Sequence, residues 1–205
     1  MENKQDYTIL LKNVRISYAS VWVRSKFDNK EGKYEATFLI PKSDTVTKDK
    51  ISAIIDRVKA DRKLKVPRDK ICVKDGDDTG IPEYEGHWTV KASNNIQPLL
   101  MDTDKTILAD GKKRFTPEEE DALEPKRKNK IYSGCRVNVY IEFWGQDNKY
   151  GKRINSNLLA VQHFEDDTPF GTRGGSVDPS QYFDVIPSAP VDTSAVEELG
   201  DDIPF

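Results

Sequence analysis

Apolar and polar residues alternate over several short stretches of the chain, which is the pattern of half-buried β-strands. The clearest stretch runs from Cys135 to Trp144, where Val137, Val139 and Ile141 share one face. The opposite face is mostly polar but carries two large aromatic residues, Tyr140 and Trp144. By the same pattern, further strands are predicted at 7–18, 33–40, 87–93 and 155–164, with a shorter one at 96–101.

Two stretches follow a helical repeat instead. Isoleucines and a valine recur at i, i+3, i+4 and i+7 within 51–58, which predicts an amphipathic helix over about 48–62. Thr116 is a good N-cap, Pro117 suits the first helical position, and acidic residues fill the first turn at 118–120. A second, short helix is therefore predicted there, ending near Pro125.

The order of these elements indicates the fold class. Several short strands without regular alternation of strand and helix favour a small antiparallel barrel or sandwich. The segment 145–149 contains turn-forming residues and predicts a long hairpin between the last two strands. The protein is therefore predicted to be mainly β, with an OB-fold, a five-stranded antiparallel barrel, carrying helical insertions.

The alternation stops after Phe164, where prolines and glycines recur and apolar residues become sparse. Such a composition is typical of a segment that buries too little apolar surface to fold. Two regions are predicted: an OB-fold domain at 5–165 and an acidic disordered tail at 166–205.

Charge is divided unevenly between these two regions. Residues 164–205 hold ten acidic residues and one basic residue, whereas the rest of the chain holds 31 basic and 25 acidic residues. A basic body suits a polyanion, because neutralised phosphates release their condensed counterions. The acidic tail can compete with that polyanion for the same groove. The division favours a nucleic-acid-binding protein.

Aromatic and basic residues are interleaved on the same segments, and sequence-tolerant binding of single strands needs both. Bases stack on aromatic rings while cations follow the phosphates. Packing in the core or at its rim is the alternative role for each aromatic residue, and apolar neighbours favour it for Tyr34, Trp88 and Phe143. The predicted DNA-binding residues are Trp22, Arg24, Lys26, Lys91, Arg136, Tyr140, Trp144, Lys149, Tyr150, Lys152 and Arg153.

Signals for catalysis, metals or cofactors are weak. The chain has no phosphate-binding Gly-rich loop and no nucleophile elbow. His87 and His163 are isolated, and Cys72 and Cys135 form no Cys-x-x-Cys pair, so zinc is not expected. One carboxylate cluster could hold a divalent cation, although its glycines favour a solvated turn; it comprises Asp75, Asp77, Asp78 and Glu83. No cofactor is predicted.

Targeting signals are also missing from the sequence. No apolar run approaches the roughly 20 residues of a membrane span, and the residues after Met1 form no apolar signal segment. Two cysteines are too few for a disulfide framework. The expected location is a reducing cytoplasm, with no membrane partner.

The last five residues combine two carboxylates with an aliphatic and an aromatic side chain. An acidic tail often serves only solubility, but Ile203 and Phe205 work against that role. The segment resembles the C-terminal tip of bacterial single-stranded-DNA-binding proteins, which implies that it recruits replication and repair enzymes. The predicted partner-binding residues are Asp201, Asp202, Ile203, Pro204 and Phe205.

Short motifs between residues 8 and 173 resemble a family of bacteriophage and prophage single-stranded-DNA-binding proteins with an OB fold. They occur in order at 13–18, 34–43, 75–77, 84–87, 132–135, 157–162 and 169–173. The resemblance implies binding of single-stranded DNA without sequence specificity, in phage replication, recombination or repair. It implies no catalytic activity and a place in the cytoplasm of the bacterial host. Oligomeric state is left open, with a homodimer as one option.

Two other functions remain as alternatives. One is a metal-dependent nuclease that uses the carboxylate cluster. The other is an adaptor without a DNA role, whose basic helix face at 48–62 binds an acidic protein.

Overall fold

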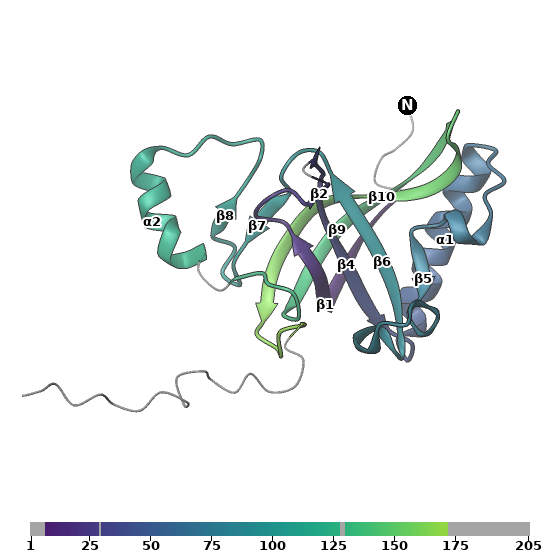
Figure 1. Ribbon diagram of the computed structural model, residues 1–205, viewed down its shortest axis with the longest axis horizontal. Coiled ribbons are helices and arrows are strands. Elements are labelled where there is room, and N and C mark those ends of the chain that lie inside the picture. The colour runs from purple at the N-terminus through teal and green to yellow at the C-terminus, as the bar shows by residue number, and fades with distance from the viewer. Residues whose placement is uncertain (1–6, 29, 128–129, 172–205) are drawn as a thin grey trace, which may run out of the picture. The chain divides into compact units, whose positions relative to one another are not determined.

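The computed structural model describes residues 7–28, 30–127 and 130–171 of the chain. Two helices lie in this part, α1 (Thr45–Asp61) and α2 (Pro117–Arg127), with short 3-10 turns η2 (Arg68–Lys70), η3 (Asp77–Thr79) and η4 (Pro82–Tyr84). The strands are β1 (Thr8–Ser20), β2 (Lys26–Phe27), β3 (Lys30–Glu31), β4 (Tyr34–Pro41), β5 (Val73–Asp75), β6 (His87–Asn94), β7 (Leu99–Met101), β8 (Ile107–Ala109), β9 (Arg136–Asn148) and β10 (Gly151–Glu165) (Figure 1). The predicted tip at 201–205 lies outside the described residues.

Five of the strands close into a barrel. β1 pairs with β4 and β9, β4 pairs with β6, and β9 pairs with β10, all antiparallel. A parallel pairing of β10 with β6, at Asn157 and Ser93, closes the ring. The OB-type barrel predicted from the sequence is confirmed, although one of its junctions is parallel. β7 joins β10 further along, and β8 pairs with β7.

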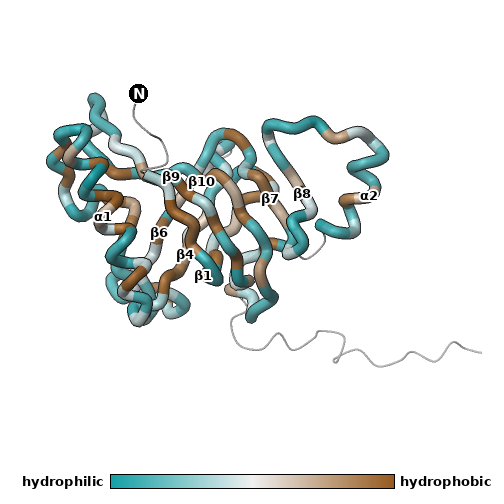
Figure 2. The backbone as a smooth tube through the Cα atoms, turned by 180° about the vertical axis from the view of Figure 1, so that it is seen from behind, coloured by the Kyte–Doolittle hydropathy of each residue, from teal (hydrophilic) through white to brown (hydrophobic). Residues whose placement is uncertain are grey.

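The interior of the barrel is filled by alternate residues of its strands. Val137, Val139, Ile141 and Phe143 of β9 are fully buried, as their alternation predicts. In Figure 2 the hydrophobic positions concentrate on the barrel strands, whereas α2 and the loop before it are largely hydrophilic. This packing sends the intervening side chains of each strand to the outer surface, where a ligand can reach them.

The hairpin between β9 and β10 is longer than predicted. The segment 145–149 was expected to turn, but β9 continues to Asn148 and the chain reverses at Lys149 and Tyr150. Gly145 lies inside the strand, and a Cβ atom there would come within 2.4 Å of Leu64 Cδ1, just after α1. Its glycine therefore serves close packing, which is a known reason for glycine inside a strand.

Both predicted helices are present, with shifted ends. α1 begins at Thr45, where the Asp44 carboxylate accepts a hydrogen bond from Thr47 N–H at 3.0 Å. The predicted cap of α2 is confirmed, because Thr116 and Glu119 exchange side chain–backbone hydrogen bonds as a capping box.

Pro125 does not end α2, which continues to Arg127. A proline removes one backbone hydrogen bond, and here Arg127 supplies other contacts. Its Nε donates to Leu108 O at 2.6 Å and its guanidinium pairs with Glu120. Among the described helices, neither combines the length and the apolar character that a bilayer crossing requires.

Candidate nucleic-acid interface

A groove of about 630 Å³ crosses the outer face of β4, β6 and β10. The segment 69–74 forms one wall, and the base of the β9–β10 hairpin forms another. The residues that line it are Lys33, Thr37, Asp69, Lys70, Ile71, Cys72, Lys74, Thr79, Tyr84, Thr89, Lys91, Ser93, Asn94, Asn95, Trp144, Gln146, Arg153, Ile154, Asn155, Ser156 and Asn157. In an OB fold, the outer face of the second and third barrel strands is the usual nucleic-acid surface, and here those strands are β4 and β6.

The floor of the groove is polar but mostly uncharged because of strand alternation. Val90 and Ala92 of β6 fill the barrel interior, so Thr89, Lys91 and Ser93 face outward. Across the parallel junction, Asn155 and Asn157 of β10 continue this polar surface. Amide and hydroxyl groups can hydrogen-bond to sugars and bases without the electrostatic repulsion that carboxylates would exert on phosphates.

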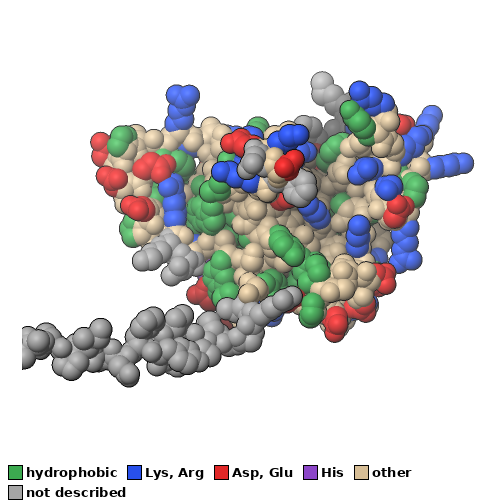
Figure 3. Space-filling model, viewed as in Figure 1, with side chains coloured by type: hydrophobic (Ala, Val, Ile, Leu, Met, Phe, Trp, Pro, Cys, Tyr) green, Lys and Arg blue, Asp and Glu red, His purple; other side chains and the backbone are tan. Residues whose placement is uncertain are grey.

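The rim of the groove carries five cations and one carboxylate, Asp69. Asp69 pairs with Lys70 at 3.0 Å, and Lys91 pairs with Glu35 of β4 at 2.8 Å. Three cations, Lys33, Lys74 and Arg153, make no side-chain ion pair with any residue that the structure describes. They are therefore available for phosphates. Figure 3, seen from the side of Figure 1, shows Lys and Arg concentrated over α1 and the β9–β10 hairpin.

Two aromatic side chains border the groove, in different ways. Trp144, on the outward face of β9, is 36% exposed and offers a ring for stacking. Tyr84 is buried, and its hydroxyl donates to Ser17 Oγ at 3.0 Å. Burial is the main reason that the pKa of Tyr84 is raised, so its hydroxyl stays protonated at neutral pH. Trp144 is thus the stacking candidate and Tyr84 a structural part of the wall.

The groove brings together three of the predicted DNA-binding residues, Lys91, Trp144 and Arg153. Arg24 borders it, because its Nη2 donates to the carbonyl of groove residue Asn95 at 2.7 Å. Lys149, Tyr150 and Lys152 lie at the tip of the hairpin, next in sequence to Arg153. The Lys149 ammonium lies 5.1 Å from the centroid of the exposed Tyr150 ring, and Lys152 pairs with Asp147 at 3.3 Å.

The structure places the other predicted residues away from this groove. Lys26 is exposed in β2, and Tyr140 donates its hydroxyl to Thr8 Oγ1 at 2.9 Å. Arg136, at the start of β9, pairs with Asp167 at 2.9 Å and contacts Asn13. Its guanidinium thus holds the segment after β10 against the barrel, and a DNA role for these residues stays a prediction.

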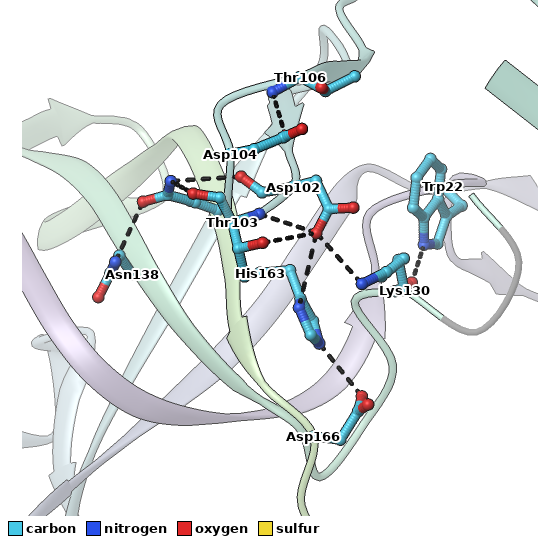
Figure 4. A network of polar contacts seen from close by, with 10 residues as sticks. Trp22, Asp102, Thr103, Asp104, Thr106, Lys130, Asn138, His163 and Asp166 are labelled. Atoms are coloured by element: carbon cyan, nitrogen blue, oxygen red, sulfur yellow. Dashed lines mark hydrogen bonds and ion pairs between the residues drawn. The ribbon is translucent and has the colours of Figure 1, made fainter. Parts of the chain in front are cut away.

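Trp22 is held within a polar network (Figure 4). Its indole Nε1 donates to the carbonyls of Lys130 and Ile131 at 3.0 and 3.2 Å, and its ring packs against the core. Lys130 pairs with Asp102 at 3.2 Å, and buried His163 lies 3.9 Å from the same carboxylate. These contacts connect the β7–β8 turn to the barrel, so packing accounts for Trp22 without a ligand.

Two members of the carboxylate cluster, Asp75 and Asp77, bind a lysine side chain. Lys42 Nζ lies 2.6 Å from Asp75 Oδ1 and 2.5 Å from Asp77 Oδ2, while Asp77 also accepts from Gly86 N–H. The hydrogen bonds to Asp75 and Asp77 raise the pKa of Lys42. The hydrogen bonds that Asp77 accepts from Lys42 and Gly86 N–H lower the pKa of Asp77. The ammonium takes the position that a cation would need. In the described ranges, no group of three or more His, Cys, Asp or Glu is arranged to hold a metal ion.

Neither cysteine has the environment of a nucleophile. Burial raises the pKa of the Cys72 thiol, in the groove, to about 11, and that of buried Cys135 also to about 11. Both are free thiols, and thiols with such pKa values are almost entirely protonated at neutral pH.

Sequence reasoning missed most of the groove, including three of its cations, Lys33, Lys70 and Lys74, and the aromatic Tyr84. Lys33 immediately precedes a predicted strand, so its place at the strand end could have been noticed. Lys70 and Lys74 depend on the segment 69–74, which reaches the barrel through the three-residue strand β5 and a single bridge from Ile71 to Ile154. Pairings this short leave no periodic signal in a sequence.

Comparisons with known proteins point to phages. The family model described as "Enterobacter phage Enc34, ssDNA-binding protein" matches residues 7–190. A relative from Acyrthosiphon pisum secondary endosymbiont phage 1, "Putative protein p50", is 31% identical over 193 residues, covering 88% of this chain and 95% of its own.

Two solved structures of the single-stranded-DNA-binding protein from bacteriophage Enc34 are also similar. The one in complex with single-stranded DNA is 33% identical with a TM-score of 0.69, and the match covers 83% of this chain and 96% of that one. The other is 34% identical with a TM-score of 0.65, covering 90% of this chain and 97% of that one.

Proposed function

We propose that this chain, which belongs to the family of the Enterobacter phage Enc34 single-stranded-DNA-binding protein, binds single-stranded DNA without sequence specificity in the groove over β4, β6 and β10. A relative of this chain has been solved in complex with single-stranded DNA. The groove itself carries the proposal: within the described residues, Lys33, Lys74 and Arg153 make no ion pair, and they surround a polar floor that is mostly uncharged. Such a surface grips a phosphate backbone, while Trp144 gives bases a plane to stack on.

Binding to oligothymidine at two salt concentrations tests this proposal. Each phosphate contact contributes about −0.7 to the slope of log affinity against log salt for single strands. Three contacts predict that affinity falls about 20-fold between 50 and 200 mM salt. Fluorescence anisotropy measures this fall. Mixed-sequence oligonucleotides of equal length are the control and are expected to bind with similar affinity.

The same titration has outcomes that contradict the proposal. No binding at low salt, or binding that does not depend on salt, would remove the groove as a phosphate site. Cleavage of the labelled strand in the presence of Mg²⁺ or Mn²⁺ would favour the nuclease alternative. The stoichiometry at saturation also tests the homodimer, which the sequence left open as one option.

The proposal includes a biological setting. A protein of this kind covers strands exposed during phage DNA replication, recombination and repair, in the cytoplasm of the bacterial host. It needs no catalytic residue for this role, because the bound protein protects the strand by occupying it.

We further propose that the tip at 201–205 recruits replication and repair proteins, while the acidic tail weakens unproductive contacts with DNA. Deleting Asp201–Phe205 is expected to leave the affinity for oligothymidine unchanged or raised, because two acidic side chains are removed and no groove cation is lost. The deletion is also expected to abolish co-purification with host replication and repair proteins that bind the bacterial tip.

Phe205→Ala provides the matched variant, since it keeps both carboxylates. It is expected to lose the partner proteins while its DNA affinity stays unchanged. A truncated protein with lower DNA affinity would show that the tip belongs to the DNA site instead.

A further inference from the structure

Tyr18 has an unusual backbone conformation near the end of β1. Its φ is 47°, in the left-handed region that a non-glycine residue seldom adopts, and its side chain is 66% exposed. The pairing of β1 with β4 shifts here: Ser17 faces Thr37 and Ser20 faces Glu35, so β1 contains one extra residue. A bulge of this kind redirects a side chain that would otherwise alternate into the barrel.

The bulge places Tyr18 beside the groove. Thr37, the partner of Ser17, lines the groove, and adjacent strands lie about 4.8 Å apart. The buried wall residue Tyr84 bonds to Ser17, the residue before Tyr18. Tyr18 thus lies one strand beyond β4, next to the part of the groove that Thr37 lines.

Contacts with neighbouring side chains do not explain the position of the Tyr18 ring. The Tyr18 side chain makes no hydrogen bond, ion pair or ring contact with another residue in the described ranges. A strained backbone that presents an exposed ring, held in place by its surroundings, is typical of a ligand-binding position. A ring with two rotatable angles loses little entropy on contact, and any base can stack on it.

We infer that Tyr18 is a base-stacking position that extends the path of single-stranded DNA from the groove across β1. This inference rests on the proposed function and specifies its extent. The strand would pass from Trp144 on β9, over the floor of β6 and β4, to Tyr18. The bound DNA is then one nucleotide longer than the stretch that fits in the groove, because one base stacks on Tyr18.

Substitutions at Tyr18 test the inference through oligothymidine affinity. Tyr18→Ala is expected to lower the affinity about 5- to 100-fold, the range found for loss of one stacked base. Tyr18→Phe keeps the ring and is expected to bind within about twofold of the original protein. Leu10→Ala, on the same strand and 51% exposed, is the matched control and is expected to have no effect.

Tyr18→Gly separates stacking from a structural role. Glycine adopts positive φ without strain, so the urea midpoint of Tyr18→Gly is expected to stay at or above that of Tyr18→Ala. The DNA affinity of Tyr18→Gly is expected to fall as much as that of Tyr18→Ala. Oligonucleotide length gives a second readout. The loss at Tyr18→Ala is expected with long oligothymidines and should vanish with those short enough to occupy the groove alone.

The outcomes distinguish this inference from the proposed function. If the unmodified protein fails to bind oligothymidine, the proposed function itself is wrong. If it binds and Tyr18→Ala binds equally well at every length, the groove stands but Tyr18 is not part of the site. A loss that Tyr18→Phe shares would show that the hydroxyl, not the ring, makes the contact, and would also overturn the stacking assignment.

Discussion

Replacing Lys74 and Arg153 together with glutamate is expected to lower the affinity for oligothymidine by about 100-fold or more at low salt. Each of these side chains lines the groove and has no ion-pair partner among the described residues. A charge-assisted contact contributes about 1.5–3 kcal/mol, and a carboxylate in its place repels the phosphate. Fluorescence anisotropy against labelled oligothymidine measures the loss.

The salt dependence of binding by this double variant gives a second, independent measure of the phosphate contacts that are lost. Loss of two phosphate contacts is expected to reduce the slope of log affinity against log salt by about 1.4. Lys12→Glu with Lys50→Glu is the charge-matched control, since both lysines are exposed and lie outside the groove. If the control pair weakens binding as much as the groove pair, net charge alone drives binding and the groove is not the site.

Alanine substitutions at two adjacent residues of β9, Phe143 and Trp144, are expected to affect different properties, the first stability and the second DNA binding. Phe143 is fully buried in the barrel, whereas Trp144 is 36% exposed and lines the groove. Phe143→Ala is expected to lower the free energy of unfolding by about 3–5 kcal/mol, from lost burial and the cavity left behind. Trp144→Ala is expected to cost about 1 kcal/mol of stability or less and about 1–3 kcal/mol of DNA-binding free energy.

Urea denaturation and oligothymidine titration of both variants measure these two effects. Tyr140→Ala is a useful comparison, because Tyr140 shares the outward face of β9 but does not line the groove. Unchanged DNA binding by Trp144→Ala would remove Trp144 from the site. A loss at Tyr140→Ala as large as at Trp144→Ala would mean that DNA follows β9 rather than β4 and β6.

The barrel could be predicted because each of its long strands buries one face. Alternation identifies β1, β4, β6, β9 and β10 to within a few residues at most ends. It fails at Gly145, where a glycine that usually marks a turn instead allows Leu64 to approach the strand. It also fails for β5 and β8, since three residues are too few to show a period.

The site could be predicted in part, for a related reason. Lys91, Trp144 and Arg153 lie on long strands, whose outward faces the alternation defines. Trp22 and Arg136 have the same residue types and similar local sequences, yet Lys130 and Asp167, both distant in sequence, bind them. Residue type therefore selects candidates for a binding surface, and only the long-range partners show which side chains remain available to a ligand.

The parallel junction between β6 and β10 has a consequence for how the protein is made. The strand that completes the ring is the last one of the barrel, ending at Glu165, and it covers the open edges of both β6 and β9. A nascent chain still on the ribosome therefore exposes two unpaired edges until nearly all of its barrel has emerged, and exposed edges favour association between chains. Because the closing contacts join residues far apart in sequence, folding is expected to be slow.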